Sequence, residues 1–340
     1  MDKVAVIGGG PIGLYTALLL SQKGLAVHLF EKGTWPRDKV CGQGIMPSGV
    51  HKLEELDIKF NHLNAYAFNG IKYIDNDLEL IGFFKKNALG VKREELSKAL
   101  YYKCKEHKSI FLHPNSKITE LNALKDFKEI YACDGLHSQM RKLTKNEKVR
   151  TGQKRMGARF HVSLSPWSQQ VEVYWAHKLE AYVTPVSNQV IEVAFLWYQD
   201  QFQAGAQLKE RLLESFPKLF KKLEQDKFLD DFKAYGPFDR YSKKIKDGNI
   251  TFLGDAYYFL DGITGEGLSL GFKSAEIMTG EQALFIKKLR VRALYMNYQL
   301  WVNLALSLSR HPRLRRLLFK VFNLIPSQFN RVLSLNDLSL

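Results

Sequence analysis

The opening of the chain, KVAVIGGGPIG at residues 3–13, constrains the fold more than any other stretch. Its first five residues are a continuous apolar run, which is typical of a parallel strand covered on both faces. Residues 14–23 carry helix formers that end at Gly24, and the run LAVHLFE at 25–31 predicts the next strand. A strand, a glycine turn, a helix and a second strand in this order predict a βαβ unit.

The glycine turn has the spacing Gly8-x-Gly10-x-x-Gly13 and lies between the predicted strand and helix. Gly8 permits the tight turn, Gly10 lets the backbone approach a pyrophosphate at the helix N-terminus, and Gly13 lets helix and strand pack closely. Glu31 ends the second strand, where a carboxylate can bind a ribose 2′-hydroxyl. A carboxylate there disfavours a 2′-phosphate, so the predicted ligand is NAD or FAD rather than NADP.

Strands that run into glycine corners recur later in the chain, at EIYACDG (129–135) and at ITFLGD (250–255). Between these corners the pattern changes. Residues 155–198 alternate apolar and polar side chains, which predicts antiparallel strands with one wet face. Residues 208–226 predict a helix with a break at Pro217.

No linker or repeat separates these patterns, so we predict an interleaved architecture. Its parts are a nucleotide-binding domain at 1–55, 91–150 and 240–285, a substrate domain at 56–90 and 151–239, and a basic helical C-terminal region at 286–340.

The net charge of +15 is concentrated at one end of the chain. From Gln282 onward there are ten Lys or Arg residues and one acid, Asp337. This distribution argues against a nucleic-acid-binding surface spread over the protein. The longest uncharged run of this region, residues 293–309, is short and polar for a membrane span.

The cysteines and histidines bear on the cellular location and on whether a metal site is expected. Cys41, Cys104 and Cys133 show no C-x-x-C spacing, and the first residues show no secretory signal, so we expect a reducing, cytoplasmic location. The histidines show no H-x-x-x-H or H-E-x-x-H pattern, and no metal site is predicted.

The glycine corners also carry a family resemblance. ACDGLHSQMR (132–141) and FLGDAYYFLDGITGEGLSLGF (252–272) resemble the Asp-Gly and Gly-Asp motifs of FAD enzymes with the p-hydroxybenzoate hydroxylase and geranylgeranyl reductase fold. KVCGQGIMPSG (39–49) resembles the family's loop beside the flavin, and VKREEL (91–96) its flavin-contacting arginine. The resemblance implies an α/β fold, in which a Rossmann-type FAD-binding domain is interleaved with an antiparallel-sheet substrate domain and followed by a helical C-terminus.

In that family FAD lies across two corners, because the first corner holds only its ADP half. The resemblance implies that Asp255 bonds the ribityl chain and that the glycines after it bring backbone N–H groups to the flavin ring. The cofactor-binding residues it implies are Gly8, Gly10, Pro11, Ile12, Gly13, Glu31, Lys32, Cys41, Gly42, Arg93, Asp134, Gly135, Gly254, Asp255, Gly265, Glu266, Gly267 and Leu268.

The resemblance leaves the reaction open between two branches. We favour an NAD(P)H-dependent monooxygenase that hydroxylates a hydrophobic or aromatic small molecule; NADH or NADPH is then the electron donor. The alternative is a geranylgeranyl-reductase-like enzyme that reduces an isoprenoid or lipid. The segment ITGEGL (263–268) favours this alternative. A third possibility is a membrane-binding protein with a vestigial nucleotide fold. A halogenase is not expected, because the Trp-x-Trp-x-Ile-Pro signature is missing.

Two further hypotheses concern single regions. Cys41 is a candidate active-site thiol beside the flavin, with a small loop residue as the alternative. In the C-terminal region, Leu314, Leu317, Leu318, Val321 and Phe322 recur at helical spacing beside Arg313, Arg315, Arg316 and Lys320. That pattern predicts either an interfacial helix that contacts anionic membrane or a helix that packs on the flavin domain.

Overall fold

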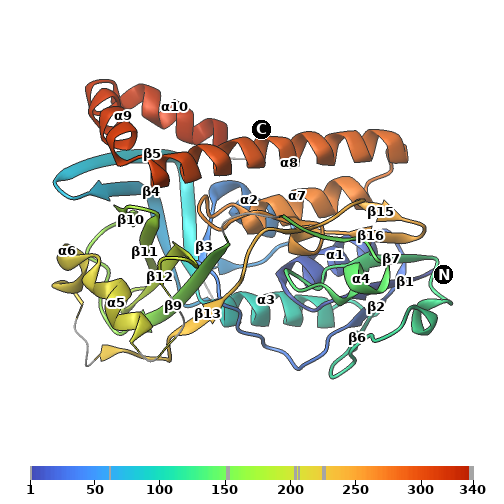
Figure 1. Cartoon of the computed structure of the whole chain (residues 1–340). Coiled ribbons are helices and arrows are strands. Elements are labelled where there is room, and N and C mark those ends of the chain that lie inside the picture. The colour runs from blue at the N-terminus through green and yellow to red at the C-terminus, as the bar shows by residue number, and fades with distance from the viewer. Residues whose placement is uncertain are drawn as a thin grey trace.

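The computed structural model describes residues 2–60, 63–150, 154–202, 205, 207–223 and 227–336, and it contains two large sheets (Figure 1). The first sheet has six strands in the order β15-β16-β7-β1-β2-β6, and all its pairs are parallel except β15 with β16. These strands are β1 (Lys3–Ile7), β2 (Ala26–Phe30), β6 (Ile110–His113), β7 (Glu129–Ala132), β15 (Lys246–Asp247) and β16 (Ile250–Phe252). Strands from distant parts of the sequence therefore meet in one layer.

Three helices cover this sheet: α1 (Pro11–Gln22), α3 (Arg93–Lys105) and α7 (Gly267–Thr279). Helix α1 packs between α3 and α7. It begins at Pro11, a position whose N–H would make no hydrogen bond within the helix, so the proline costs nothing there. Gly24 follows its end with φ +73, so the strand, helix and stop expected at residues 3–31 are confirmed.

The second sheet has eight strands in the order β13-β9-β12-β11-β10-β4-β5-β3. Its pairs are antiparallel except β10 with β4, which is parallel. The strands are β3 (Gly44–Ile45), β4 (Ala65–Asp75), β5 (Leu78–Val91), β9 (Arg155–Val162), β10 (Val171–Ala176), β11 (Leu179–Ser187), β12 (Val190–Tyr198) and β13 (Lys233–Tyr235).

The wet face expected for residues 155–198 is wrong, because β9, β10, β11 and β12 are buried on both faces. On one face Phe160, Phe195 and Trp197 pack beneath two short helices, α5 (Leu208–Glu214) and α6 (Pro217–Phe220). The other face carries the polar residues of the alternation, including Arg159 and Glu192. They are covered by segments from the nucleotide-binding part of the chain rather than by water.

The helix expected at 208–226 is interrupted at Pro217, as predicted: α5 ends at Glu214 and α6 begins at the proline. Residues 224–226 of that prediction lie outside the described residues.

The C-terminal region is helical, as expected, with α8 (Leu284–Arg310), α9 (Pro312–Leu324) and α10 (Pro326–Asn336). Helix α8 runs along the top of the molecule above both sheets, and α9 and α10 lie over β4 and β5 (Figure 1). Among the helices in the described ranges, none is long and apolar enough to cross a membrane. The smaller elements are α2 (Pro47–Glu54), α4 (Gln139–Leu143) and a sheet of β8 (Glu147–Val149), β14 (Arg240–Ser242) and β17 (Tyr258–Phe259).

Candidate cofactor and substrate site

The first glycine turn needs two of its glycines for its own geometry. Gly8 has φ +102, a backbone conformation that residues with a Cβ rarely adopt. Its N–H donates to the carbonyl oxygen of Phe30 at 2.8 Å. A Cβ on Gly13 would lie 1.8 Å from the carbonyl oxygen of Gly8. Both residues therefore hold α1 close against β1, in the roles that their spacing predicts.

Gly10 differs from its neighbours, because nothing in the chain requires it. Its φ of −75 is open to any residue, and a Cβ built on it meets no atom within 4 Å. The open space lies at the N-terminus of α1, where unpaired N–H groups and the helix dipole favour an anion. A pyrophosphate bound at the N-terminus of α1 requires this open space beside Gly10.

Glu31 lies at the mouth of the same turn and is buried. One of its carboxylate oxygens accepts from the N–H of Gly9 at 2.7 Å, the other accepts from the N–H of Gly33 at 2.9 Å, and Arg37 forms an ion pair with it. The carboxylate is thus fixed where β2 ends, as a ribose ligand would have to be. Lys32, the next residue, is exposed to solvent.

The second corner, after β16, is built around Gly254 and Asp255. Gly254 has φ +56, and the carbonyl oxygen of Asp255 accepts from the buried guanidinium of Arg141 at 2.8 Å. The Asp255 carboxylate is paired with Lys39 Nζ at 2.7 Å. Burial disfavours the charged amine, but the Asp255 carboxylate, with Tyr235 and Cys41, outweighs it and raises the pKa of Lys39.

Helix α7 begins at this corner in the same way as α1 begins at the first. Gly265 precedes it with φ +71, Glu266 is buried, and a Cβ on Gly267 would meet no atom within 4 Å. Leu268 is partly buried against the core. Ile12, in the first turn of α1, lies against Gly254 and against Gly271 of α7, so the starts of the two helices are close together. An extended cofactor with a pyrophosphate and a second polar half fits this pair.

Asp134 and Gly135 form the third corner. The Asp134 carboxylate accepts from Ser138 Oγ at 2.6 Å and from the N–H of Met140 at 3.0 Å, and burial raises its pKa. Both oxygens are therefore engaged at the start of α4, which gives this aspartate a structural task in the turn. Gly135 has φ +79, and a Cβ there would lie 3.9 Å from Lys39 Nζ.

Cys41 lies in the loop that joins the two sheets. Its Sγ accepts from Nε of the buried Arg93 at 3.1 Å and lies 3.5 Å from the carbonyl oxygen of Lys39. Burial raises the pKa of the thiol, and the Arg93 guanidinium opposes that shift only in part. The protonated thiol is thus favoured, which lowers the nucleophilicity that the sequence suggested. Gly42, beside it, has open space around its Cα.

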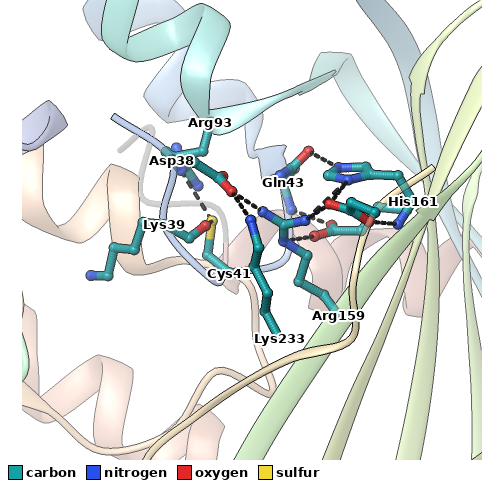
Figure 2. A network of polar contacts seen from close by, with 10 residues as sticks. Asp38, Lys39, Cys41, Gln43, Arg93, Arg159, His161 and Lys233 are labelled. Atoms are coloured by element: carbon teal, nitrogen blue, oxygen red, sulfur yellow. Dashed lines mark hydrogen bonds and ion pairs between the residues drawn. The ribbon is translucent and has the colours of Figure 1, made fainter. Parts of the chain in front are cut away.

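A network of charged and polar side chains around the buried Arg159 adjoins this loop, and sequence reasoning missed it (Figure 2). Arg159, on β9, is 1% exposed and forms ion pairs with Asp38 and Asp230. Lys233, on β13, also contacts Asp38, at 3.0 Å. His161 Nδ1 lies 2.8 Å from Asp230, and its Nε2 lies 2.9 Å from Gln43 Oε1. The network therefore joins loop 38–43 to the polar face of the second sheet.

Glu192, on β12, is the most deeply buried acid of this cluster, with no exposed surface. Its Oε2 accepts from the N–H of Gln43 at 2.7 Å, and its Oε1 lies 3.9 Å from Arg159 Nε. Burial raises its pKa to about 8, against the opposing influence of the Gln43 N–H and of the Arg159 and Arg93 guanidiniums. A carboxyl group that holds a proton near neutral pH is typical of functional sites.

The sequence held one signal for this network. Arg155 and Arg159 of β9 share a face with Glu192 of β12. A charged face flanked by strongly apolar neighbours can be either wet or part of a site. Only the packing of loop 38–43 against the sheet decides between the two.

One known family matches the N-terminal part of the chain. Residues 1–67 match the family described as FAD binding domain. A flavin-dependent halogenase of Armillaria mellea is 37% identical over 89 residues, which are 24% of this chain and 16% of the relative. A menaquinone reductase of Mycobacterium tuberculosis is 38% identical over 55 residues, which are 16% of this chain and 14% of the relative. The matches thus span less than a fifth of these relatives' length.

Two solved structures cover nearly the whole chain. A flavoprotein/dehydrogenase from Cytophaga hutchinsonii has a TM-score of 0.78 at 18% identity and covers 93% of this chain and 87% of its own. A 2-methyl-3-hydroxypyridine-5-carboxylic acid oxygenase has a TM-score of 0.69 at 16% identity, with 94% and 93% covered. The chain therefore shares the overall fold of these two proteins. The expected fold class, with its interleaved Rossmann-type part, is confirmed.

The family matched at residues 1–67 is described as an FAD binding domain, and the residues of this chain fit FAD. The open approach at Gly10 suits the pyrophosphate, and the fixed carboxylate of Glu31 suits the ribose. At the flavin end, Nη1 of the buried Arg93 has no hydrogen-bond partner among the described residues. An orphaned guanidinium nitrogen in this position suits an oxygen of the cofactor.

Proposed function

We propose that this flavoprotein is an FAD-dependent oxidoreductase, and that its reaction is the NAD(P)H-dependent oxygenation of a hydrophobic or aromatic small molecule. The observation that carries this proposal is the pairing of two open helix starts, at Gly10 and Gly267, beside a buried polar sheet face. FAD, when bound, supplies the redox chemistry. The chain supplies binding, orientation and exclusion of water.

The roles we propose for single residues follow from their positions. Gly10 admits the pyrophosphate, Glu31 holds the ribose, and Asp255 and the N-terminus of α7 hold the second half of the cofactor. The Lys39–Asp255 ion pair fixes loop 38–43 over that corner. We retain the division into an FAD-binding domain at 1–55, 91–150 and 240–285, a substrate domain at 56–90 and 151–239, and a C-terminal region at 286–340.

The second candidate is reduction of an isoprenoid or lipid without insertion of oxygen. The local identity with the menaquinone reductase favours it, since that relative's name describes a reductase of a lipid-like molecule. The two candidates differ in what the reduced flavin does with oxygen.

Anaerobic reduction followed by an oxygen pulse tests the proposal. The FAD-loaded protein is reduced with NADH or NADPH, mixed with oxygen, and followed by flavin absorbance. A monooxygenase gives a transient spectrum that is neither oxidised nor reduced flavin before reoxidation. Reoxidation in one phase without a transient supports the reductase, and failure to take up FAD rejects both.

We also propose that the C-terminal helices contact an anionic membrane, where a hydrophobic substrate resides. Most large apolar side chains that are exposed in the described residues lie in 284–325. Phe285 of α8 is 76% exposed and Leu324 of α9 is 83% exposed. Exposed cations lie among these side chains at Lys288, Arg292 and Lys320, and apolar and basic residues on one face favour an anionic surface.

The predicted basic face needs one correction. Arg315 does not point to solvent: it is 1% exposed and its Nε donates to Asp75 at 2.9 Å. It therefore anchors α9 to β4 instead of meeting a membrane. Leu314, Leu317 and Val321 are exposed, so the packing alternative does not account for them.

Sedimentation with liposomes tests the contact. The protein should pellet with anionic vesicles at low salt, and about 1 kcal/mol per engaged cation should be lost as salt rises. Replacing Phe285 and Leu324 with Ser should weaken pelleting, while replacing exposed Phe111, on the far sheet edge, should not. Wild-type protein that stays in the supernatant with anionic vesicles contradicts the contact.

A further inference from the structure

We propose that Arg155, Asp261 and Tyr298 are positioning residues of the second cofactor corner: they fix the backbone of residues 261–267, where the second half of FAD binds. This inference deepens the proposed function and rests on it, because it concerns how that same corner is held. The three side chains come from β9, from the loop before α7 and from α8, so they join the substrate domain, the FAD-binding domain and the C-terminal region.

The backbone at the start of this loop is held by tyrosine hydroxyls. Tyr298 of α8, which is 5% exposed, donates to the carbonyl oxygen of Asp261 at 2.5 Å and accepts from the N–H of the same residue at 3.3 Å. Two residues further on, Tyr182 of β11 donates to the carbonyl oxygen of Ile263 at 2.7 Å. Both hydroxyls bond backbone groups of the loop, so they fix the path of the chain itself.

The side chain of Asp261 anchors the same loop to β9. Its Oδ1 accepts from the N–H of Ile263 at 3.0 Å. The Arg155 guanidinium bonds both carboxylate oxygens, with Nε at 3.0 Å from Oδ2 and Nη2 at 3.3 Å from Oδ1, and Nη2 also donates to Glu180 at 2.8 Å. Two hydrogen bonds from one planar guanidinium fix the orientation of a carboxylate as well as its position.

This anchor consists of buried charges. Arg155 is 4% exposed, Asp261 is 2% exposed and Glu180 has no exposed surface. Burial disfavours the charged guanidinium, but the carboxylates of Asp261 and Glu180 outweigh it and raise the pKa of Arg155. A buried ion pair adds little net stability over well-packed apolar residues, but it can hold a structure in one geometry. The geometry held here is that of the loop.

The anchored residues lead directly into the open start of α7. The N–H of Gly265 donates to the carbonyl oxygen of Gly262 at 3.0 Å, which closes a turn between the anchored residues and the helix. Gly265 has φ +71, and a Cβ on Gly267 would meet no atom of the described residues within 4 Å. Glycines leave this turn few side chains with which to hold itself. Its position therefore depends on the anchors at 261 and 263.

Comparison of FAD with ADP tests the proposal, because ADP fills only the first corner, around Gly10 and Glu31. In Tyr298→Phe, which removes one hydroxyl, FAD affinity should fall about tenfold and ADP affinity should keep its wild-type value. Calorimetry on the full-length protein after removal of FAD measures both affinities. The fluorescence anisotropy of bound FAD should also fall, because a loosened loop lets the flavin ring move. The matched control is Tyr174→Phe, which removes a buried hydroxyl bonded to Glu172 on the opposite face of the sheet and should match wild type.

Variants of Arg155 test the anchor to β9. Arg155→Met removes both hydrogen bonds to Asp261 and should lower FAD affinity at least about tenfold, again without a loss of ADP affinity. Arg155→Lys keeps the charge and should recover part of the FAD affinity. The control is Arg315→Met, which breaks another buried ion pair, with Asp75 at 2.9 Å. It should lower stability in urea as Arg155→Met does, but leave both affinities at their wild-type values.

The outcomes are distinct from those of the proposed function. FAD affinity that is unchanged in Tyr298→Phe and Arg155→Met overturns the positioning role even if the wild type binds FAD and turns over. Equal losses of FAD and ADP affinity also overturn it, because a partly unfolded protein loses both. If Arg155→Met does not fold, Tyr298→Phe decides alone. Wild-type protein that takes up no FAD rejects the proposed function.

Discussion

The two sheets form their sites from different groups: backbone atoms at one sheet and side chains at the other. At the parallel sheet the backbone makes the site, through glycines that leave helix starts open at Gly10 and Gly267. At the eight-stranded sheet the side chains make it, through a buried network around Arg159 and Glu192. A backbone site tolerates substitution of the neighbouring side chains, but it does not tolerate a Cβ at the open glycine positions. A side-chain site depends on every charge being paired.

Gly10→Val gives the largest expected effect and tests the backbone site. The chain itself leaves room for the new side chain, but that side chain occupies the approach of the pyrophosphate. We expect FAD affinity to fall by about a hundredfold or more, or about 2.7 kcal/mol, in a fluorescence titration, with an unchanged unfolding transition.

Gly13→Ala is the matched contrast. Its Cβ would lie 1.8 Å from the Gly8 carbonyl oxygen, so folding should suffer before FAD binding does. Equal FAD affinity in wild type and Gly10→Val would remove the assignment of the open space to the cofactor.

Arg159→Leu tests the side-chain site. The change leaves Asp38 and Asp230 without their shared cation, and loss of one buried partner costs about 3–5 kcal/mol of unfolding free energy in urea. Lys233→Leu is the control, because this partner of Asp38 is exposed and should cost less than about 1 kcal/mol. If the two variants cost the same, burial is not what makes this network important.

Glu192→Gln tests the side-chain site through the pH dependence of the unfolding free energy. The folded-state pKa of Glu192 is raised from 4.5 to about 8, so between these values the folded protein holds a proton that the unfolded chain has released. Wild-type stability therefore falls as pH rises through this window, by about 1.4 kcal/mol per pH unit, and the loss ends above pH 8. The variant should lack this loss. Parallel pH profiles for the two proteins would show that Glu192 is not protonated.

Cys41→Ser should have the smallest effect. The thiol of Cys41, whose pKa is raised, accepts a hydrogen bond from Arg93, and a hydroxyl can accept the same hydrogen bond. We expect full FAD content and a stability change below about 1 kcal/mol. Alkylation of wild-type Cys41 at neutral pH should be slow and slower still with FAD. A large loss of turnover with normal FAD content would restore the catalytic thiol hypothesis.

The same contrast explains what the sequence could predict. The glycine spacing and Glu31 indicated the nucleotide fold, because local turn geometry demands those residues within one βαβ unit. Asp134 was ambiguous, since a short acid at a strand end serves a turn or a ligand equally well, and its bonds to Ser138 and Met140 favour the turn. Glu192 could not be found, because its role arises from contact with Gln43, which is distant in sequence.

The order of strands in the parallel sheet has a consequence for synthesis. Strand β16 completes the layer beside β7, yet Ile250 pairs with Ile130, about 120 residues earlier. At translation rates of roughly 5–20 residues per second, β7 waits on the order of ten seconds for its partner. Its apolar edge is exposed on the ribosome for that interval, and an open strand edge is prone to pair wrongly. A nascent chain halted before residue 250 should therefore need a chaperone more than the finished protein does.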